Sequence, residues 1–153
     1  MKAVVQRVKN ASVSVDGQVH GKIPAGLVVY LGVAQGDTQA DAAYLGEKIG
    51  NLRIFADDDG KMNRSVKDAG GGILAVSQFT LLADTRKGRR PFYGDAAEPA
   101  MAKALYTCFM DKIREQGLRC ESGVFQAHME VTYTNDGPVT ILLDSKDRSL
   151  PGV

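Results

Sequence analysis

Two hydroxyl groups and a histidine are the side chains with the clearest potential for nucleophilic chemistry. Ser77 and Thr80 lie in the segment Ser-Gln-Phe-Thr-Leu, directly after an apolar run, and either could attack an ester if a base such as His128 activated it. The sequence contains no Gly-x-Ser-x-Gly pattern, which marks a nucleophile elbow. Because an unactivated hydroxyl is a poor nucleophile, a lone Ser or Thr at a strand end is more often structural than catalytic.

Patterns typical of metal and phosphate sites are weak. His20 and His128 are far apart and form neither a His-x-x-x-His nor a His-Glu-x-x-His pattern. Residues 57–60 (Asp-Asp-Asp-Gly) could hold a hard cation, but such a run between two short strands is more often a solvated turn. Residues 70–72 (Gly-Gly-Gly) precede a strand, so they lack the helix N-terminus that binds phosphate. We expect no metal and no cofactor.

The densest positive charge lies in a predicted loop over residues 84–95. Four cations occupy five positions, and two aromatic residues follow: Arg86, Lys87, Arg89, Arg90, Phe92 and Tyr93. Cations neutralise phosphates and rings stack on unpaired bases, so the loop is a candidate nucleic-acid contact. A solvated charged loop is the alternative, and a net charge of only +1 excludes binding by bulk charge.

A fourth segment, Asn-Asp-Gly-Pro at residues 135–138, has two interpretations. Asp-Gly between two strands is typical of a hairpin turn, and the local pattern favours that interpretation. Alternatively, a cis bond between Gly137 and Pro138 would fix two carbonyl groups in one direction.

The elements that must position these residues fit one domain over residues 1–153. With 44% hydrophobic and 24% charged residues, the chain has an ordinary globular composition. Val-rich runs predict strands over 1–33 with a hairpin at Asp16-Gly17 and a buried strand at 27–31. Further strands are predicted at 53–55, 73–76, 129–134 and 139–143, which makes the class mixed α/β.

Two helices are predicted to pack on one face of the sheets. The first begins at Asp37-Thr38 and buries a face formed by Ala42, Leu45, Ile49 and Leu52. The second follows the basic loop, ends before Gly117 and buries Met101, Leu105, Cys108, Phe109 and Ile113. The polar tail over 144–153 is expected to be loosely held.

The pattern of cysteines and the length of the apolar runs indicate the cellular compartment. Cys108 and Cys120 form no Cys-x-x-Cys pair and are expected to be buried free thiols. The first residues lack the apolar stretch of a signal peptide, and no apolar run approaches the length of a membrane span. We therefore expect a cytoplasmic protein without a membrane partner.

Two of these segments together resemble the paired signature of the D-aminoacyl-tRNA deacylase family, of the D-Tyr-tRNA deacylase type. They are Ser-Gln-Phe-Thr-Leu at 77–81 and Asn-Asp-Gly-Pro-Val-Thr at 135–140, about 60 residues apart. The first eight residues (Met-Lys-Ala-Val-Val-Gln-Arg-Val), Met-Glu-Val at 129–131 and the chain length also match. The resemblance covers essentially the whole chain.

The resemblance implies a compact three-layer β/β/α fold and a homodimer with sites at the subunit interface. It implies hydrolysis of the ester that joins a D-amino acid to the terminal adenosine of tRNA, with glycyl-tRNA as a further substrate. The implied catalytic residues are Ser77, Gln78, Phe79 and Thr80, and the implied substrate-binding residues are Arg7, Asn135, Gly137 and Pro138.

The roles that the resemblance implies rest mainly on main-chain groups. The amides around Phe79 and Thr80 would stabilise the oxyanion, and the ribose 2′-OH of the substrate would orient water. Thr80 would have a positioning role and would not act as the nucleophile. Gly137 and Pro138 would reject L-amino acids in the pocket of the other protomer, and Arg7 would brace their loop across the dimer. The residues themselves leave two rivals open: a Ser/Thr-nucleophile esterase that uses Thr80 or Ser77, and a non-catalytic RNA-binding module.

Overall fold

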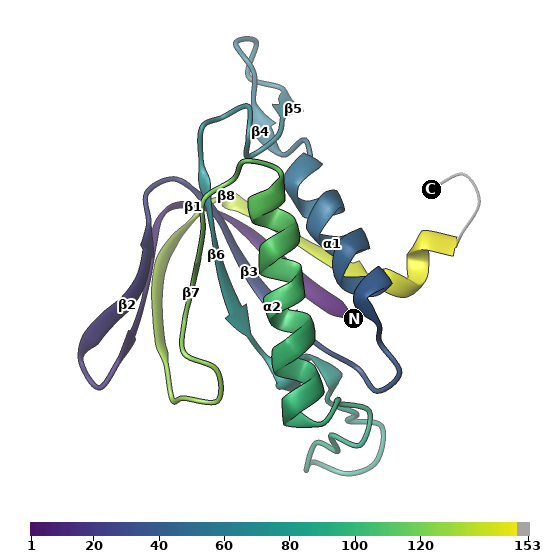
Figure 1. Ribbon diagram of the computed structural model, residues 1–153. Helices are drawn as coiled ribbons and strands as arrows, with labels where there is room; N and C mark the ends of the chain where they lie inside the picture. Colours follow the sequence, from purple (N-terminus) through teal and green to yellow (C-terminus); the bar gives the residue numbers. More distant parts are fainter. Residues whose placement is uncertain (150–153) are drawn as a thin grey trace.

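The computed structural model describes residues 1–149, and its N-terminal strands follow the predicted pattern (Figure 1). Strand β1 (Lys2–Val15) pairs with β2 (Gln18–Ile23) and with β3 (Gly26–Gly32), both antiparallel. Asp16 and Gly17 join β1 to β2 with φ values of 50° and 79°, which is the backbone of a two-residue hairpin. The predicted hairpin is confirmed.

A single six-stranded sheet forms the centre of the domain. Its order is β2-β1-β3-β6-β7, and β8 pairs with β1 as well. The added strands are β6 (Gly72–Ser77), β7 (Cys120–Ser122) and β8 (Glu130–Asp144). The sheet nearly closes between β2 and β7, because a Cβ on Gly21 would lie 2.4 Å from the Ser122 carbonyl oxygen. The sequence suggested several sheets. The structure instead has one curled six-stranded sheet and a separate two-stranded ribbon.

Both helices cover one face of this sheet, as predicted (Figure 1). Helix α1 (Gln39–Asn51) begins with a capping box between Thr38 and Asp41. Helix α2 (Pro99–Glu115) buries Leu105, Phe109 and Ile113. The prediction for Met101 is wrong: it is 52% exposed, because the first turn of α2 projects beyond the sheet next to the loop over 84–95.

Strand β3 separates two layers of the core. Leu27, Val29 and Leu31 pack in the cluster under the helices, whereas Val28 packs in a second cluster with residues of β1, β2 and β6. This explains why the run is apolar without alternation: both faces of the strand are covered. The two apolar layers agree with a mixed α/β domain in which a curled sheet lies under two helices.

Strand β8 corrects the predicted hairpin at residues 135–138. Both halves of β8 pair with β1, since Asn135 lies opposite Val8 and Thr140 lies opposite Gln6. Between these pairs β1 contributes only Arg7, whereas β8 contributes residues 136–139, so this segment bulges out of one continuous strand. The local Asp-Gly signal fails because β1 is long enough to pair with both halves, and the chain never reverses.

A small ribbon and a turn follow α1. Strand β4 (Phe55–Ala56) pairs with β5 (Met62–Arg64), slightly beyond the strand predicted at 53–55. The Asp57 carboxylate accepts hydrogen bonds from the amides of Asp59 and Lys61 and from the Asn63 side chain. The run of acids is therefore a hydrogen-bonded turn, as the sequence favoured.

The segment after β8 is held more firmly than predicted. Residues Ser145–Ser149 form the short helix η2, and the buried Ser145 hydroxyl donates to Asp41 at 2.7 Å. Arg148 also donates to Asp41. The expectation of a loose tail is wrong for residues 144–149, because these contacts attach the segment to α1; residues 150–153 lie outside the described residues.

Both cysteines are free, and Cys120 is buried whereas Cys108 is half-buried. Burial raises the pKa of the Cys120 thiol to about 11, which keeps it protonated and unreactive at neutral pH. Across residues 1–149, no helix is long and apolar enough to cross a membrane.

Candidate active site

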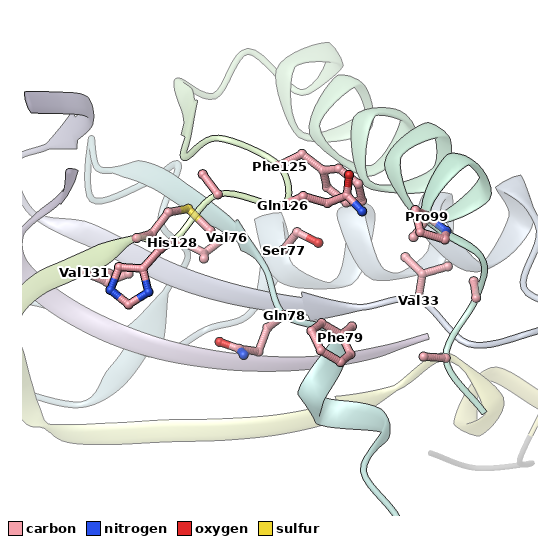
Figure 2. A pocket seen from close by; sticks show the side chains of 15 residues that line it. Val33, Val76, Ser77, Gln78, Phe79, Pro99, Phe125, Gln126, His128 and Val131 are labelled. Carbon is pink, nitrogen blue, oxygen red and sulfur yellow. The ribbon is translucent and has the colours of Figure 1, made fainter. Parts of the chain in front are cut away.

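A cavity of about 560 Å³ lies at the end of β6, between the curled sheet and the start of α2 (Figure 2). Ser77, Gln78 and Phe79 form one wall. The segment over residues 125–131 forms the opposite wall, and Val33 with the first residues of α2 completes the lining. The structure thus brings three of the four residues of the first predicted motif to one concave site.

The end of β6 explains how these three residues reach the cavity. The Gln78 amide donates to the Leu31 carbonyl at 2.8 Å, which keeps the chain beside β3 for one residue after the strand. The chain then turns into the 3-10 helix η1 (Phe79–Leu82). A Cβ on Gly32 would lie 2.7 Å from the Leu82 side chain, so the close approach of η1 to β3 requires glycine there.

The main-chain amides at the start of η1 are available to a ligand. Phe79 and Thr80 are the first residues of this helix, and a helix leaves its first amide groups without acceptors of its own. Within residues 1–149, neither amide donates to a main-chain or side-chain acceptor outside the helix. Two adjacent N–H donors beside a cavity can stabilise an anionic oxygen.

The side chain of Thr80 has a different environment from that of a nucleophile. It is exposed, it is not part of the cavity wall, and its hydroxyl accepts a hydrogen bond from the Gln78 side-chain amide. An amide N–H cannot act as a base. The geometry therefore gives the hydroxyl no activating partner among the described residues.

His128 shares the cavity with Ser77 without contacting it. In Figure 2 the Ser77 hydroxyl faces the cavity, while the imidazole of His128 points away from it. Over the described part of the chain, no hydrogen bond joins the two side chains. A nucleophile and its base must lie within hydrogen-bond reach, so this arrangement lacks the geometry of a Ser-His pair.

The bulge over residues 136–139 lies away from this cavity within the single chain. Gly137 and Pro138 are exposed, the peptide bond between them is cis, and neither lines the cavity. Gly137 has φ of 130°, a conformation that L side chains rarely adopt, so this position requires glycine. The two predicted motifs therefore do not meet inside one protomer.

Arg7, on β1, anchors the bulge. Its Nε donates to the Asp136 carbonyl at 3.2 Å, and its Nη1 donates to the Ile54 carbonyl at 2.7 Å. The Asp136 carboxylate lies 3.6 Å from Nε, and an added Cβ on Gly137 would be 3.1 Å from Nη2. The brace that the resemblance implied across a dimer is thus formed within one chain, because Arg7 is the β1 residue opposite the bulge.

Asn135 closes the base of the same bulge. Its side-chain oxygen accepts from the Val139 amide at 3.3 Å, and its side-chain nitrogen donates to the Thr140 hydroxyl at 3.2 Å. The same hydroxyl accepts from Gln6 at 3.1 Å. These contacts give Asn135 a positioning role for Gly137 and Pro138.

The basic loop is exposed, and its charges are not equivalent. Arg86 donates to the Asp84 carboxylate at 2.9 and 2.6 Å, and these hydrogen bonds lower the pKa of Asp84 to about 2. Within residues 1–149, no ion pair involves Lys87, Arg89 or Arg90. The last three cations are therefore the better candidates for contacting phosphate, and Arg86 is partly neutralised.

In the wall formed by residues 125–131, sequence reasoning named His128 and residues 129–131 but missed residues 125–127. Phe125 and Met129 line the cavity, and Gln126 has φ of 67° without being glycine. Nothing in the residue types marks residues 125–127, since the wall is defined by its approach to β6 and α2 across the fold. Ala96 and Ala97 join the lining through the bridge between Ala34 and Ala96.

The described residues contain no group of three or more His, Cys, Asp or Glu side chains that could hold a metal ion. The chemistry available at the site is that of main-chain amides, one hydroxyl (Ser77), two carboxamides (Gln78 and Gln126), the His128 imidazole and apolar walls.

Comparisons with known proteins show the family to which the chain is similar. The family model described as D-Tyr-tRNA(Tyr) deacylase matches residues 4–144. A protein from Koribacter versatilis named D-aminoacyl-tRNA deacylase is 60% identical, covering 95% of this chain and 98% of its own length. A Thermus aquaticus protein of the same name is 56% identical, covering 97% of both chains.

Solved structures extend the similarity to the fold. The c-Myc DNA Unwinding Element Binding Protein matches with a TM-score of 0.88 and 42% identity over 94% of this chain and 98% of that one. A probable eukaryotic D-amino acid tRNA deacylase matches with a TM-score of 0.78 at 17% identity over 93% and 97%, which bears on the fold alone. The resemblance carried by the two sequence motifs is confirmed, and the chain belongs to the D-Tyr-tRNA(Tyr) deacylase family of enzymes.

Proposed function

We propose that this enzyme hydrolyses the ester bond of D-aminoacyl-tRNA and releases free tRNA and the D-amino acid in the cytoplasm. The single observation that carries the proposal is the wall formed by Ser77, Gln78 and Phe79, with free main-chain amides beside a cavity of about 560 Å³. Relatives at 56–60% identity that bear the name D-aminoacyl-tRNA deacylase support the same activity. Water adds to the carbonyl carbon, the bond to the ribose oxygen breaks, and the ribose oxygen leaves with a proton.

The amides of Phe79 and Thr80 stabilise the oxyanion of the tetrahedral intermediate. Main-chain donors are fixed by the fold, so they need no reorganisation as negative charge develops, and one such donor contributes on the order of 3 kcal/mol. Their position at the first turn of η1, beside Gln78 and Ser77 at the pocket floor, supports this role.

Water is oriented by the substrate rather than by a protein base. The ribose 2′-OH next to the ester can hold the attacking water, and the Thr80 hydroxyl positions the Gln78 side chain through their hydrogen bond. The absence of contact between His128 and Ser77 across the described cavity supports this assignment over a Ser/Thr-nucleophile esterase.

Chiral selection comes from the bulge of a second protomer. In this proposal the enzyme is a homodimer, and the carbonyls of Gly137 and Pro138 from one protomer enter the cavity of the other. There they meet the amine and Cα of the substrate, so an L side chain would collide with them while a D side chain points outward. Glycine has no side chain to reject, so glycyl-tRNA is also a substrate.

Three features of one chain support this arrangement. The bulge is exposed, it is absent from the cavity of its own chain, and Arg7 holds it from the side of β1. An exposed segment that is anchored by an arginine and two side-chain hydrogen bonds is suited to contact another surface.

The basic loop contacts the tRNA backbone. Arg86, Lys87, Arg89 and Arg90 would bind phosphates without reading sequence, which suits an enzyme that serves many tRNAs. The three cations without an ion pair in the described chain contribute most.

Parallel incubation with D-tyrosyl-tRNA and L-tyrosyl-tRNA tests the proposed function. We expect release of tyrosine from the D ester alone, and release of glycine from glycyl-tRNA. Equal hydrolysis of the D and L esters would reject chiral selection by the bulge. Tight binding of uncharged tRNA without any ester turnover would instead indicate a non-catalytic RNA-binding module.

A further inference from the structure

Exposed aromatic residues lie where the basic loop reaches the rim of the cavity. Phe79 lines the cavity, and its ring contacts the ring of Tyr93 edge to face, with centroids 5.1 Å apart. Phe92, which precedes Tyr93 in the chain, is 66% exposed, whereas large apolar side chains in folded proteins are usually buried. Phe92 and Tyr93 are adjacent in the chain, which therefore links the rim of the candidate active site to the basic loop.

The ring of Phe92 packs against Gly94 although it is exposed. A Cβ on Gly94 would lie 2.3 Å from Cζ and 2.4 Å from Cε1 of Phe92, so the ring covers the glycine backbone. The main chain of Phe92 is fixed by two hydrogen bonds with Asp84, of 2.8 and 2.9 Å. Gln35 donates to the Gly94 carbonyl at 2.7 Å and so fixes the glycine backbone that the ring contacts.

The surroundings of this ring carry the charge that a nucleic acid needs. Lys87, Arg89 and Arg90 lie at the tip of the same loop, exposed and without an ion pair among the described residues. An exposed aromatic ring close to cations without ion pairs is the arrangement that binds single-stranded nucleic acid by stacking and phosphate contact.

We infer that Phe92 is a stacking platform for an unpaired nucleotide at the 3′ end of tRNA, next to the terminal adenosine that carries the ester. The inference rests on the proposed function, because an ester at the terminal ribose places the neighbouring unpaired nucleotides at the mouth of the cavity. Tyr93 buttresses Phe79 at the rim, and Phe92 binds the base that lies one step further out.

Five variants separate the ring from its surroundings. Phe92→Ala removes it, Phe92→Leu keeps apolar volume without a π-face, and Phe92→Tyr keeps the face. Gly94→Ala leaves Phe92 in the sequence but drives its ring off the backbone. Val19→Ala is the matched control, because Val19 is 61% exposed and lies on β2 away from the basic loop.

The first measurement is equilibrium binding of uncharged tRNA with an intact 3′ end and of the same tRNA without its unpaired 3′ nucleotides. We expect Phe92→Ala, Phe92→Leu and Gly94→Ala to weaken binding of intact tRNA on the order of tenfold, the effect of losing one stacked base. Binding of the truncated tRNA should not change further, and Phe92→Tyr and Val19→Ala should bind like wild type.

The second measurement compares kcat/KM for D-tyrosyl-tRNA with kcat/KM for D-tyrosyl-adenosine, which lacks the neighbouring nucleotides. The ratio of the two values should fall on the order of tenfold in Phe92→Ala and recover in Phe92→Tyr. An equal loss with truncated and intact tRNA, or no loss in Phe92→Ala, would overturn the inference. If wild type hydrolysed neither ester, the proposed function would fail, and the binding measurement would still decide the role of Phe92.

Discussion

Removal of the Arg7 side chain is the sharpest perturbation of the selective bulge, because this one residue anchors it from β1. Arg7→Ala deletes the hydrogen bonds to the Asp136 and Ile54 carbonyls and the 3.6 Å ion pair with Asp136. The Arg7 side chain is only 16% exposed, so these contacts are largely shielded from water. The change therefore tests stability and selectivity together.

The expected loss of stability follows from those contacts. A hydrogen bond from a charged donor contributes about 1.5–3 kcal/mol, and part of this is recovered when water reaches the half-exposed acceptor at Asp136. We expect a decrease of about 2–3 kcal/mol in the free energy of unfolding. For a chain of this size that corresponds to a decrease in Tm of about 4–12 °C by calorimetry.

The effect on selectivity is larger than a general loss of activity. Without Arg7 the carbonyls of Gly137 and Pro138 lose their fixed position, and a misplacement of about 1 Å can change a rate by up to about a hundredfold. We expect hydrolysis of L-tyrosyl-tRNA to rise relative to the D ester, so that the D/L ratio of kcat/KM falls on the order of tenfold.

Two control variants isolate the contribution of the bulge. Arg119→Ala removes an arginine that also makes a main-chain hydrogen bond and an ion pair, but at the edge of β2 and β7. Its D/L ratio should equal that of wild type. Arg7→Lys keeps the charge without the planar fork and should give an intermediate ratio. A folded Arg7→Ala variant with an unchanged D/L ratio would refute the role of the bulge.

Three further predictions concern other parts of the site and the fold. Thr80→Val should keep kcat within about threefold of wild type, because the Thr80 hydroxyl only accepts a hydrogen bond from Gln78. Loss of a nucleophile would instead lower kcat by several orders of magnitude, and single-turnover kinetics distinguish the two outcomes. Exchanging Lys87, Arg89 and Arg90 together for Gln should raise KM on the order of tenfold at low salt and leave the D/L ratio unchanged, and an unchanged KM would remove the loop from the binding site. Asp41→Asn should lower the free energy of unfolding by about 1–3 kcal/mol, since Asp41 caps α1 and binds η2; an unchanged Tm would contradict this.

The pH dependence of the Asp41 contribution has a defined sign. Burial raises the pKa of Asp41, but hydrogen bonds from the Thr38 amide, Arg148 and Ser145 outweigh it and hold the pKa below its usual range. Stabilisation by Asp41 is therefore present above about pH 4 and is lost as the pH falls below that value. Denaturant unfolding between about pH 3 and pH 7, a range that includes the usual pKa of Asp, gives the free energy of unfolding of wild type and Asp41→Asn. The two free energies should converge as the pH falls.

Local patterns predicted those elements whose signals lie within a few neighbouring residues. The hairpin at Asp16-Gly17 needs only two residues with positive φ, and α1 needs only Thr38, Asp41 and one apolar face. The hairpin and α1 are therefore determined by the backbone and by the side chains of adjacent residues. The sequence also placed Ser77 at a strand end, where the cavity wall begins.

Features that depend on distant pairing could not be predicted in this way. The bulge at residues 136–139 exists because β1 pairs with both halves of β8, and no local signal encodes the length of another strand. The same holds for η2, whose attachment depends on Asp41, a residue about a hundred positions earlier. Met101 satisfies the helical period but lies beyond the sheet that would have covered it.

A crystal structure with a non-hydrolysable analogue, in which an amide joins D-tyrosine to the 3′ position of adenosine, tests the central claim most directly. The account predicts that the amides of Phe79 and Thr80 face the acyl oxygen, and that carbonyls of Gly137 and Pro138 from a second protomer contact the amine and Cα. An acyl carbon within bonding reach of the Ser77 or Thr80 hydroxyl, with Gly137 and Pro138 left in solvent, would contradict it.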